Sequence, residues 1–465
     1  MDTKKESRTD VEAHLILTHP SGQSFRNTKM RWVALSMACL LMVGNYYSFD
    51  NPSALQNFLT DEKGDFGLSN VQYNLLYSVY SFPNIVLPFF GGIMIDRIGV
   101  RIGLMLFSFL LIVGQFLFML GGATKLYWLM ILGRVVFGVG GESLSVAQTT
   151  LVATWFGDKE LAFALGMNIA VARLGSTINT AVTPRLYEGT QSYFITLLIG
   201  VILCSASFAC GLVLCWMDKE SDRREGKDGK KAEVSEEESV HFSDFKNLNS
   251  RFWLLTLNCM LIYGAFFTFN GNANDCLGKL FYIDSSTAGL YLMVIFIISA
   301  CVTPFFGMLT DKFGKRGTLM IFPLCLYIVA LLIIIYFPTD IGAGVLFPLI
   351  CTGIFYATYA AIFWPCIPLV VEKKLLGSAY GIVTSLQNLN LAISPLIFGS
   401  IQDTTKNNRG GYFWAIVFIM FQAVLGLYSA VALNVADFYN GNVLDKVRKQ
   451  NKDDAVRASR QSLAK

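Results

Sequence analysis

Windows of about 20 mostly apolar residues recur between polar breaks along almost the whole chain. A bilayer core is about 30 Å thick and a helix rises about 1.5 Å per residue, so each window is long enough to cross the core. The pattern predicts an all-α membrane protein with twelve transmembrane helices. The expected spans are 32–57, 71–95, 102–121, 126–156, 160–186, 192–216, 251–273, 286–310, 317–337, 341–371, 376–401 and 411–437.

The composition excludes several classes of function. Only 15% of the 465 residues are charged, against about 25% in a soluble domain. The basic residues form short clusters between apolar runs, which argues against nucleic-acid binding. The ten cysteines show no metal-ligand spacing, and the three histidines lie in the expected tails or linker. We therefore expect no cofactor and no metal, and an enzyme is the least favoured class. The first thirty residues lack the apolar core of a cleaved signal peptide.

A charged segment divides the chain. Residues 218–250 include DKESDRREGKDGKKAEVSEEES and have no large apolar residue until Val234, which is typical of a linker. We expect a tail over 1–31, a six-helix half over 32–217, the linker over 218–250, a second six-helix half over 251–440 and a tail over 441–465. Most Lys and Arg lie in the tails, the linker and the loops on that side, which predicts that both termini are cytoplasmic.

One loop motif occurs in both halves. It reads GIMIDRIGVR from Gly92 to Arg101 and GMLTDKFGKR from Gly307 to Arg316. Glycine allows close helix contact, and the aspartate can pair with basic groups or with a helix dipole. Such a contact can hold one half together while the two halves rock. We expect a gating role for Asp96, Arg97, Arg101, Asp311, Lys312 and Arg316.

Both segments match the loop signature G-x-x-x-D-[RK]-x-G-[RK]-[RK], except that Val100 replaces one basic residue. The fourth span adds RVVFGVGG from Arg134, similar to an R-x-x-x-G-x-G motif. By these motifs the chain resembles the major facilitator superfamily over residues 30 to 440. The resemblance implies the major facilitator fold, with twelve transmembrane helices in two six-helix halves and transport by alternating access. It also adds Arg134 to the gating candidates, with a structural role favoured over substrate binding.

Four ionisable residues lie inside the predicted spans. Each costs about 2.5 kcal/mol or more in hydrocarbon, so such groups usually face a hydrated cavity and a partner. They are Asp50, Arg134, Glu142 and Arg173. Arg134 and Glu142 are eight residues apart and therefore lie on similar faces of one helix, about 12 Å from each other. Glu142 could hold an ammonium and Arg173 a carboxylate, as a zwitterion requires, but a salt bridge between the two is equally compatible with the sequence.

The second half offers uncharged candidates. Trp364 precedes Pro365 in the tenth span, and Gln387 and Asn388 form a polar step in the eleventh. Trp364 could pack or could cover a substrate side chain, and the sequence leaves both open. The end of the seventh span is polar, so an external gate and a hydrated loop are both compatible with it. Its polar residues are Asn270, Asn272, Asn274 and Asp275.

Four longer strings resemble the major facilitator superfamily domain-containing protein 1 family. They are YSFDNPSALQ from Tyr47, FGVGGESLSVAQ from Phe137, ARLGSTIN from Ala172 and YGIVTSLQN from Tyr380. The resemblance implies a uniporter that exports zwitterionic or cationic dipeptides from the lysosome, with Glu142 and Arg173 clamping the peptide termini. We expect the further substrate-binding residues to be Tyr47, Asp50, Trp364, Gln387 and Asn388.

The resemblance also bears on partners and location. The chain has no Asn-x-Ser/Thr glycosylation sequon with x other than proline. The family that it resembles is similar in this and relies on a glycosylated single-span lysosomal accessory protein. The resemblance therefore implies such a protein as a partner, in addition to dipeptides and the lipid bilayer. The resemblance implies the lysosomal membrane, with the plasma membrane as the alternative. The segment from Glu12 to Leu17 is only a degenerate version of an acidic dileucine sorting signal.

Two other functions stay open. One is proton-coupled transport of peptides or another small organic solute, with Glu142 or Asp50 titrating. The first span lacks the E-x-x-E-R signature typical of proton-linked peptide transporters, which disfavours this alternative. The other is a receptor or scaffold on the same fold, which would not need Glu142 and Arg173 within the membrane.

Overall fold

The computed structural model describes residues 25–88, 98–156, 161–225, 248–336, 342–372 and 375–446, and within these ranges it is helical, without a strand. We call residues 25–225 the first half and residues 248–446 the second half. The long helices of the first half are α2 (Met30–Phe49), α5 (Asn70–Ser81), α7 (Val100–Thr124), α8 (Tyr127–Trp155), α9 (Leu161–Thr190) and α10 (Tyr193–Arg224). Those of the second half are α11 (Ser250–Phe281), α12 (Ser285–Phe313), α13 (Arg316–Tyr336), α14 (Leu346–Phe363), α16 (Leu376–Thr404) and α17 (Tyr412–Tyr439).

Short helices join the long ones. They are η1 (Phe25–Asn27), α3 (Asn51–Ala54), α4 (Gln56–Leu59), η2 (Pro83–Ile85), η5 (Gly342–Val345), η6 (Trp364–Cys366), α15 (Ile367–Val370) and η8 (Arg409–Gly411). Several mark breaks in spans that we expected to be continuous. The first span breaks before Pro52, the second before Pro83 and the tenth before Pro365. Proline lacks the backbone N–H that would continue a helix and fits best in a first turn, so each of these three breaks is followed by a short helix with proline in its first turn. Prolines also occur inside α9, α12, α13 and α16, where the helix continues past them.

Ten helices in the described part are long and apolar enough to cross a membrane, which confirms a multi-span helical protein. The expected second and fifth spans are not among the ten. Helix α5 has 12 residues before its break, and residues 89–97 lie outside the described ranges. Helix α9 has 30 residues, but Asn168, Arg173 and Asn179 interrupt its apolar surface. The full count of twelve therefore stays a prediction.

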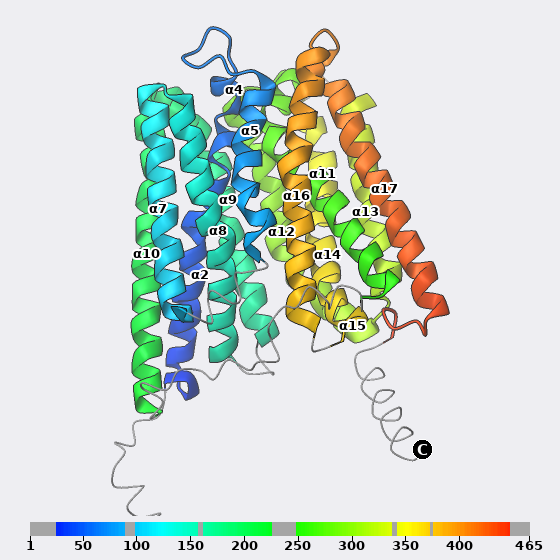
Figure 1. Cartoon of the computed structure of the whole chain (residues 1–465). Helices are drawn as coiled ribbons and strands as arrows, with labels where there is room; N and C mark the ends of the chain where they lie inside the picture. Colours follow the sequence, from blue (N-terminus) through cyan, green and yellow to red (C-terminus); the bar gives the residue numbers. More distant parts are fainter. Residues whose placement is uncertain are drawn as a thin grey trace, which may run out of the picture.

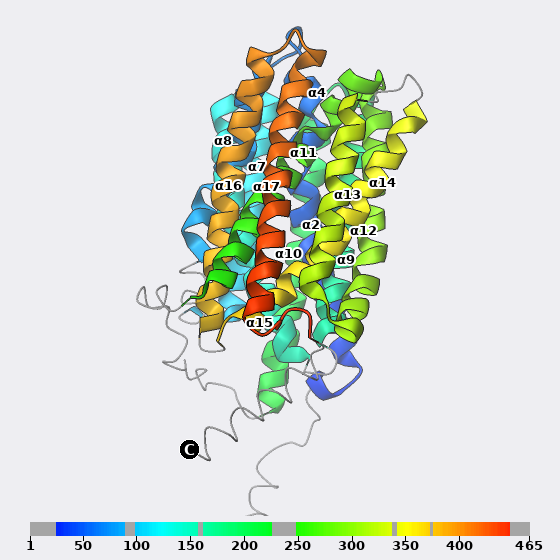
Figure 2. The same cartoon turned by 90° about the vertical axis from the view of Figure 1, so that its right-hand side faces the viewer.

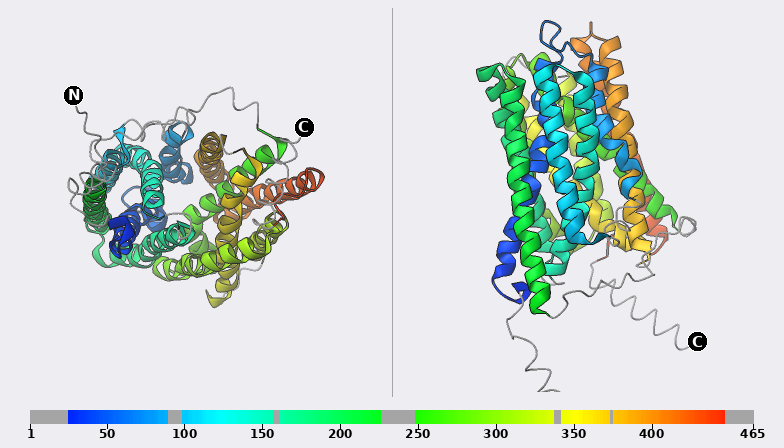
Figure 3. Two further views of the ribbon diagram at one scale, coloured as in Figure 1. Left: turned by 90° about the horizontal axis from the view of Figure 1, so that it is seen from below. Right: turned by 60° about the vertical axis from the view of Figure 1, so that its left-hand side comes forward.

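The two halves lie side by side, with their long helices roughly parallel (Figure 1). Seen from below, the first-half helices gather on one side and the second-half helices on the other (Figure 3). Helix α5 packs on α16 and α9 packs on α12, so these two pairs make the main helix contacts between the halves. Figure 2 shows α17 between α16 and α13 on the outer face of the second half.

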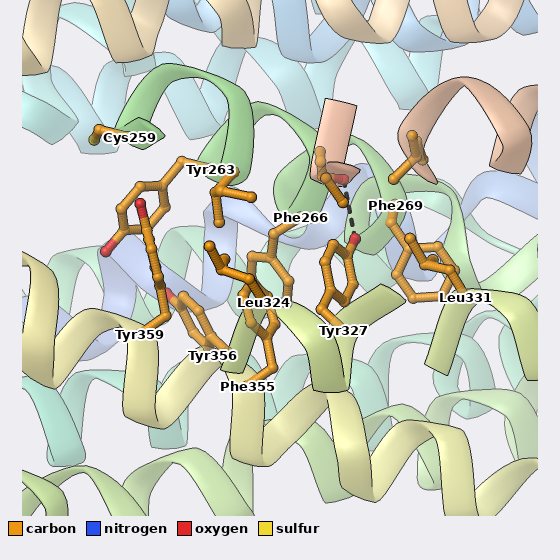
Figure 4. Packing of buried hydrophobic residues seen from close by; sticks show 14 of the residues in the cluster. Cys259, Tyr263, Phe266, Phe269, Leu324, Tyr327, Leu331, Phe355, Tyr356 and Tyr359 are labelled. Carbon is orange, nitrogen blue, oxygen red and sulfur yellow. Dashed lines mark hydrogen bonds between the residues drawn. The ribbon is translucent and has the colours of Figure 1, made fainter. Parts of the chain in front are cut away.

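Each half buries its own apolar residues. One cluster of buried side chains lies within the second half, and two others lie within the first. Figure 4 shows the second-half cluster, in which Phe266 of α11 stacks on Tyr356 of α14 with ring centroids 4.1 Å apart. Tyr327 of α13 stacks on Phe355 in the same way at 4.3 Å. Offset stacking adds stabilisation beyond the buried area, so aromatic layers hold these helices in register.

Hydrogen bonds between the halves gather at the end of the bundle opposite the described termini, the upper end in Figure 1, which we call the closed end. Amide side chains make many of them. Gln56 Nε2 donates to Asn272 Oδ1 at 2.9 Å, and Asn272 Nδ2 donates to Asn74 Oδ1 at 2.8 Å. Asn57 Nδ2 donates to Asn274 Oδ1 at 2.9 Å. The polar end of the seventh span is therefore buried between the halves and is not a hydrated loop.

Five of the expected gating residues belong to the two copies of the loop motif and make no contact between the halves that the structure describes. Asp96 and Arg97 lie outside the described residues, as does the side chain of Asp311. Lys312 lies 5.4 Å from the ring of Phe313, and Arg316 is buried at the start of α13. Their gating role stays a prediction.

Arg101 belongs to a network of charges at the end of the bundle where the described chain begins. Its Nε lies 2.6 Å from Asp218 Oδ2, and its Nη2 also contacts Asp222. Arg26 binds the same two carboxylates, each at 2.7 Å, and Glu225 at 2.9 Å. Helix α10 consequently continues to Arg224, seven residues beyond the expected edge of the first half, because these ion pairs stabilise its polar last turns.

Arg134 is 1% exposed and lies at the centre of the first half. Its Nε donates to the Leu76 carbonyl oxygen at 3.1 Å, and its Nη1 donates to that of Ser48 at 3.4 Å. Five aromatic rings lie within 6.0 Å of its guanidinium carbon, namely those of Phe49, Tyr77, Tyr80, Phe118 and Phe137. Arg134 thus connects α2, α5 and α8. Its expected roles, structural or in gating, stay predictions.

Candidate substrate site

A cavity of about 110 Å³ lies between the two halves. Helices α2, α5, α8 and α9 of the first half and α11, α12 and α14 of the second contribute its walls. Asn270 both lines the cavity and, through its carbonyl oxygen, accepts a hydrogen bond from Ser53 at the closed end. The lining residues are Asn45, Tyr46, Phe49, Asp50, Tyr80, Glu142, Ser145, Arg173, Ser176, Phe267, Asn270, Phe296 and Tyr356.

Glu142 lines the cavity from α8 and is partly buried. The Tyr80 hydroxyl donates to its Oε1 at 3.5 Å, a long contact that leaves most of the carboxylate free to bind a ligand. A glycine one turn earlier makes this arrangement possible. A Cβ atom at Gly138 would lie 2.3 Å from the Tyr80 carbonyl oxygen, so only glycine allows α5 to approach α8 this closely.

Arg173 lines the same cavity from α9 and is 4% exposed. Its guanidinium carbon lies 4.4 Å from the centre of the Tyr356 ring, a cation–π contact across the two halves. Its Nη1 donates to Thr303 Oγ1 at 2.9 Å and also to Ser299 Oγ. Gly175 lets α9 pack on α2 beside this residue, because a Cβ atom there would lie 2.4 Å from the Val43 carbonyl oxygen.

Glu142 and Arg173 face one cavity without neutralising each other. In the described structure no ion pair within 4.0 Å joins them, so the salt bridge that the sequence left open is absent in this conformation. Asp50 adds a second carboxylate to the walls and is 3% exposed. Two carboxylates and one guanidinium among aromatic rings and amides can bind an ammonium and a carboxylate of the same solute.

Four of the expected substrate-binding residues do not line this cavity. Tyr47 is fully buried, and its hydroxyl lies 3.0 Å from Thr183 Oγ1. Trp364 Nε1 donates to the Tyr263 hydroxyl at 2.9 Å. In α16, Gln387 Oε1 lies 3.7 Å from Cys259 Sγ, and Asn388 Nδ2 donates to the Thr384 carbonyl oxygen at 3.0 Å. The structure thus brings together Glu142, Arg173 and Asp50, and leaves Tyr47, Trp364, Gln387 and Asn388 in packing contacts outside the cavity.

Helical periodicity could have found several lining residues that the sequence analysis missed. Successive residues are rotated by about 100° around a helix, so residues at i+3 or i+4 share a face. Tyr46 therefore shares a face with Asp50, as Ser145 does with Glu142 and Ser176 with Arg173. Phe267, Phe296 and Tyr356 carry no such signal, since many apolar helices contain Phe and Tyr.

A bundle of membrane-spanning helices in two halves, with a charged cavity between them and hydrogen bonds closing one end, defines a membrane transporter. Residues 33–395 match the Major Facilitator Superfamily, and the chain belongs to this family. Over 440 residues it is 37% identical to the lysosomal dipeptide transporter MFSD1 of Homo sapiens, covering 91% of this chain and 90% of that protein. The MFSD1 protein of Bos taurus is 36% identical over 434 residues, covering 91% and 89%. Since these relatives are transporters, transport and not catalysis is the function of the family.

Solved structures agree with the fold. A mutant form of the nucleoside transporter NupG superposes with a TM-score of 0.69 at 14% identity and covers 86% of this chain and 99% of its own. A bacterial homologue of the human lysosomal transporter Spinster, in an inward-facing and unoccupied conformation, superposes with a TM-score of 0.65 at 16% identity, covering 88% and 96%. At these identities the likeness establishes the shared fold alone.

Proposed function

We propose that this chain is a uniporter that exports zwitterionic or cationic dipeptides from the lysosome to the cytosol by alternating access. The observation that carries the proposal is that Glu142 and Arg173 line one buried cavity and are not paired with each other. The relatives that are 36 to 37% identical over about nine-tenths of the chain are dipeptide transporters, which supports the same substrate class.

The charges suit the two ends of a peptide. Glu142 accepts hydrogen bonds from the peptide ammonium, and the planar guanidinium of Arg173 donates to the carboxylate. Asp50 is available to a cationic side chain of the peptide. The cavity of about 110 Å³ is smaller than the roughly 300 Å³ of typical small-molecule sites, so its walls must move apart to admit a dipeptide. Such movement is what alternating access between two halves supplies.

Location and partners follow from the same proposal. The closed end faces the lysosomal lumen, and the termini lie in the cytosol, as the excess of Lys and Arg in the tails and linker favours. The plasma membrane is the alternative location. A glycosylated single-span lysosomal protein accompanies the transporter, because the chain has no glycosylation sequon of its own for protection in the lumen.

Uptake by proteoliposomes tests the proposal. Wild-type protein should take up a labelled Lys- or His-containing dipeptide whether or not a pH gradient is applied. Glu142→Gln removes the charge that holds the ammonium, which costs about 1.5–3 kcal/mol and lowers uptake about tenfold to hundredfold. Glu220→Gln is the matched control, because Glu220 does not line the cavity and pairs with Arg223 and Arg224 of its own helix, so its loss should leave uptake unchanged.

The alternative function predicts a different result. If Glu142 or Asp50 carries a coupled proton, uptake will require an inward proton gradient. In that case proton-coupled transport replaces uniport. Absence of dipeptide uptake by the wild-type protein would remove the substrate class and leave the transporter fold.

A further inference from the structure

In the described part of the chain, one of the three guanidinium nitrogens of Arg173 makes hydrogen bonds to protein. Nη1 donates to the hydroxyls of Ser299 and Thr303, both on α12 of the second half. Among the described residues, Nε and Nη2 have no hydrogen-bond partner, although the residue is 4% exposed. Other polar atoms in the described structure are fully buried and lack a hydrogen-bond partner, but Nε and Nη2 of Arg173 are not among them. Both atoms are therefore accessible from the cavity that Arg173 lines. The Nη1 corner of the guanidinium is therefore held by protein, and the edge formed by Nε and Nη2 is available to bind a ligand.

The two hydroxyls are arranged as acceptors. Thr303 Oγ1 donates its own proton to the Ser299 carbonyl oxygen at 2.6 Å, so only its lone pairs remain to face Arg173. A hydroxyl with its proton committed in this way is a directional acceptor for Nη1. Replacing Thr303 by valine keeps the shape and removes this acceptor.

The plane of the guanidinium is fixed as well. Tyr356 of α14 covers its face at 4.4 Å, and Tyr356 is itself stacked on Phe266 at 4.1 Å in the buried cluster of the second half (Figure 4). With one edge and one face held, the remaining Nε–Nη2 edge has a single orientation. That edge carries two parallel N–H donors, the geometry that binds a carboxylate through both of its oxygens.

We propose that Ser299, Thr303 and Tyr356 are positioning residues that make Arg173 a receptor for the carboxylate of the substrate. The proposal rests on the proposed dipeptide transport and names the residues that select a free C-terminus. The same cavity contains Glu142 and Asp50, and an unrestrained guanidinium could turn to either of them and be neutralised. Held by α12 and α14, Arg173 keeps its charge and its free edge for the solute.

The arrangement also makes carboxylate binding depend on both halves. Arg173 belongs to the first half, and all three positioning residues belong to the second. A rearrangement that separates α9 from α12 removes the hydroxyls from Nη1. The carboxylate site is therefore complete only in conformations in which these helices meet, and its affinity changes as the halves move.

Uptake of a dipeptide and of its C-terminal amide tests the inference. Wild-type protein should prefer the free acid. The double variant Ser299→Ala with Thr303→Val should raise the KM for the free acid about tenfold, with a much smaller change for the amide and a preserved maximal rate. The conservative pair Ser299→Thr with Thr303→Ser should keep the wild-type preference. Thr352→Val on α14 is the control, because in the described structure its hydroxyl donates to the Pro348 carbonyl oxygen of its own helix.

The outcomes separate the two proposals. Equal KM changes for acid and amide, or no change for either, would overturn the role of the hydroxyls while dipeptide transport stands. Wild-type uptake of acid and amide with equal KM would overturn carboxylate recognition altogether. Failure of the wild-type protein to transport any dipeptide would refute the proposed function and this inference with it. Thermal unfolding of each purified variant identifies misfolded protein, and the single Thr303→Val substitution then replaces the double variant.

Discussion

Replacing Asp403 by alanine is expected to weaken the closed end without unfolding either half. Asp403 lies in the last turn of α16, and its carboxylate reaches the start of α5 in the other half. It accepts from Asn70 Nδ2 at 2.8 Å and from the backbone N–H groups of Asn70 and Val71 at 3.2 and 3.1 Å. Ser69 caps the same helix from within its own half and satisfies a different N–H, that of Gln72. Asp403 is thus a helix cap supplied from across the interface.

The size of the effect follows from these contacts. Loss of a helix cap costs about 0.5–2 kcal/mol, and hydrogen bonds to a charged group contribute about 1.5–3 kcal/mol each. For a partly buried carboxylate we expect about 2 kcal/mol, which lowers the ratio of closed to open molecules about 30-fold. Asp403→Asn keeps an acceptor oxygen and loses only the charge, so it should cost about 0.5–1 kcal/mol.

Distances between labels measure the change. With the exposed Cys301 and Cys325 replaced by serine, cysteines introduced at the exposed positions Asp61 and Asn407 would carry spin labels on opposite sides of the closed end. Asp403→Ala should add a population with a longer distance, and Asp403→Asn should add a smaller one. Asp284→Ala is the control, because Asp284 caps α12 within its own half by accepting from the Thr287 N–H at 2.9 Å. If both alanine variants give the wild-type distance distribution, the reasoning about Asp403 is refuted.

Two further predictions concern packing and pH. Gly138→Ala should cost about 1–3 kcal/mol and reduce uptake, because the added Cβ would lie 2.3 Å from the Tyr80 carbonyl oxygen. Thermal unfolding checks this prediction. Gly166→Ala is the control, because a Cβ atom added at Gly166 would have no neighbouring atom within 4 Å in the described structure outside its own helix. Equal losses of thermal stability in the two variants would contradict the prediction. Hydrogen bonds from the Thr287 side chain and backbone hold the pKa of Asp284 below its ordinary value. A lowered pKa means that the cap stabilises the protein at higher pH and is lost as the pH falls through that pKa, so the difference in thermal stability between wild type and Asp284→Ala should shrink below about pH 4.

The sequence was sufficient for the features that depend on local pattern. Apolar windows predicted a multi-span helical protein, and the paired loop motif and Arg134 indicated the superfamily that the comparison confirms. The cost of burying charge singled out Glu142 and Arg173, which the structure brings to one cavity. Each of these features depends on the residue types within a short segment, so it can be predicted without knowing which distant residues are in contact.

The sequence was not sufficient where the reason lies in distant contacts. Tyr47 and Tyr46 are chemically alike, and only the rotation of α2 against its neighbours decides which one faces the cavity. Trp364 hydrogen-bonds Tyr263, which is about 100 residues away in the chain. The hydroxyls of Ser299 and Thr303 carry no signal of their own, because Ser and Thr are common in membrane helices and usually bond their own backbone.

The amide contacts at the closed end have a consequence for how the transporter responds to acidity. Gln56, Asn74 and Asn272 hold the halves together there through primary amides, as Asn57 and Asn274 do beside them. Primary amides keep the same protonation state between acidic and neutral pH, unlike carboxylates or imidazoles. The strength of these bonds is therefore the same in an acidic compartment and in neutral medium. An acidic medium therefore leaves these amide contacts intact, and breaking them requires no proton transfer.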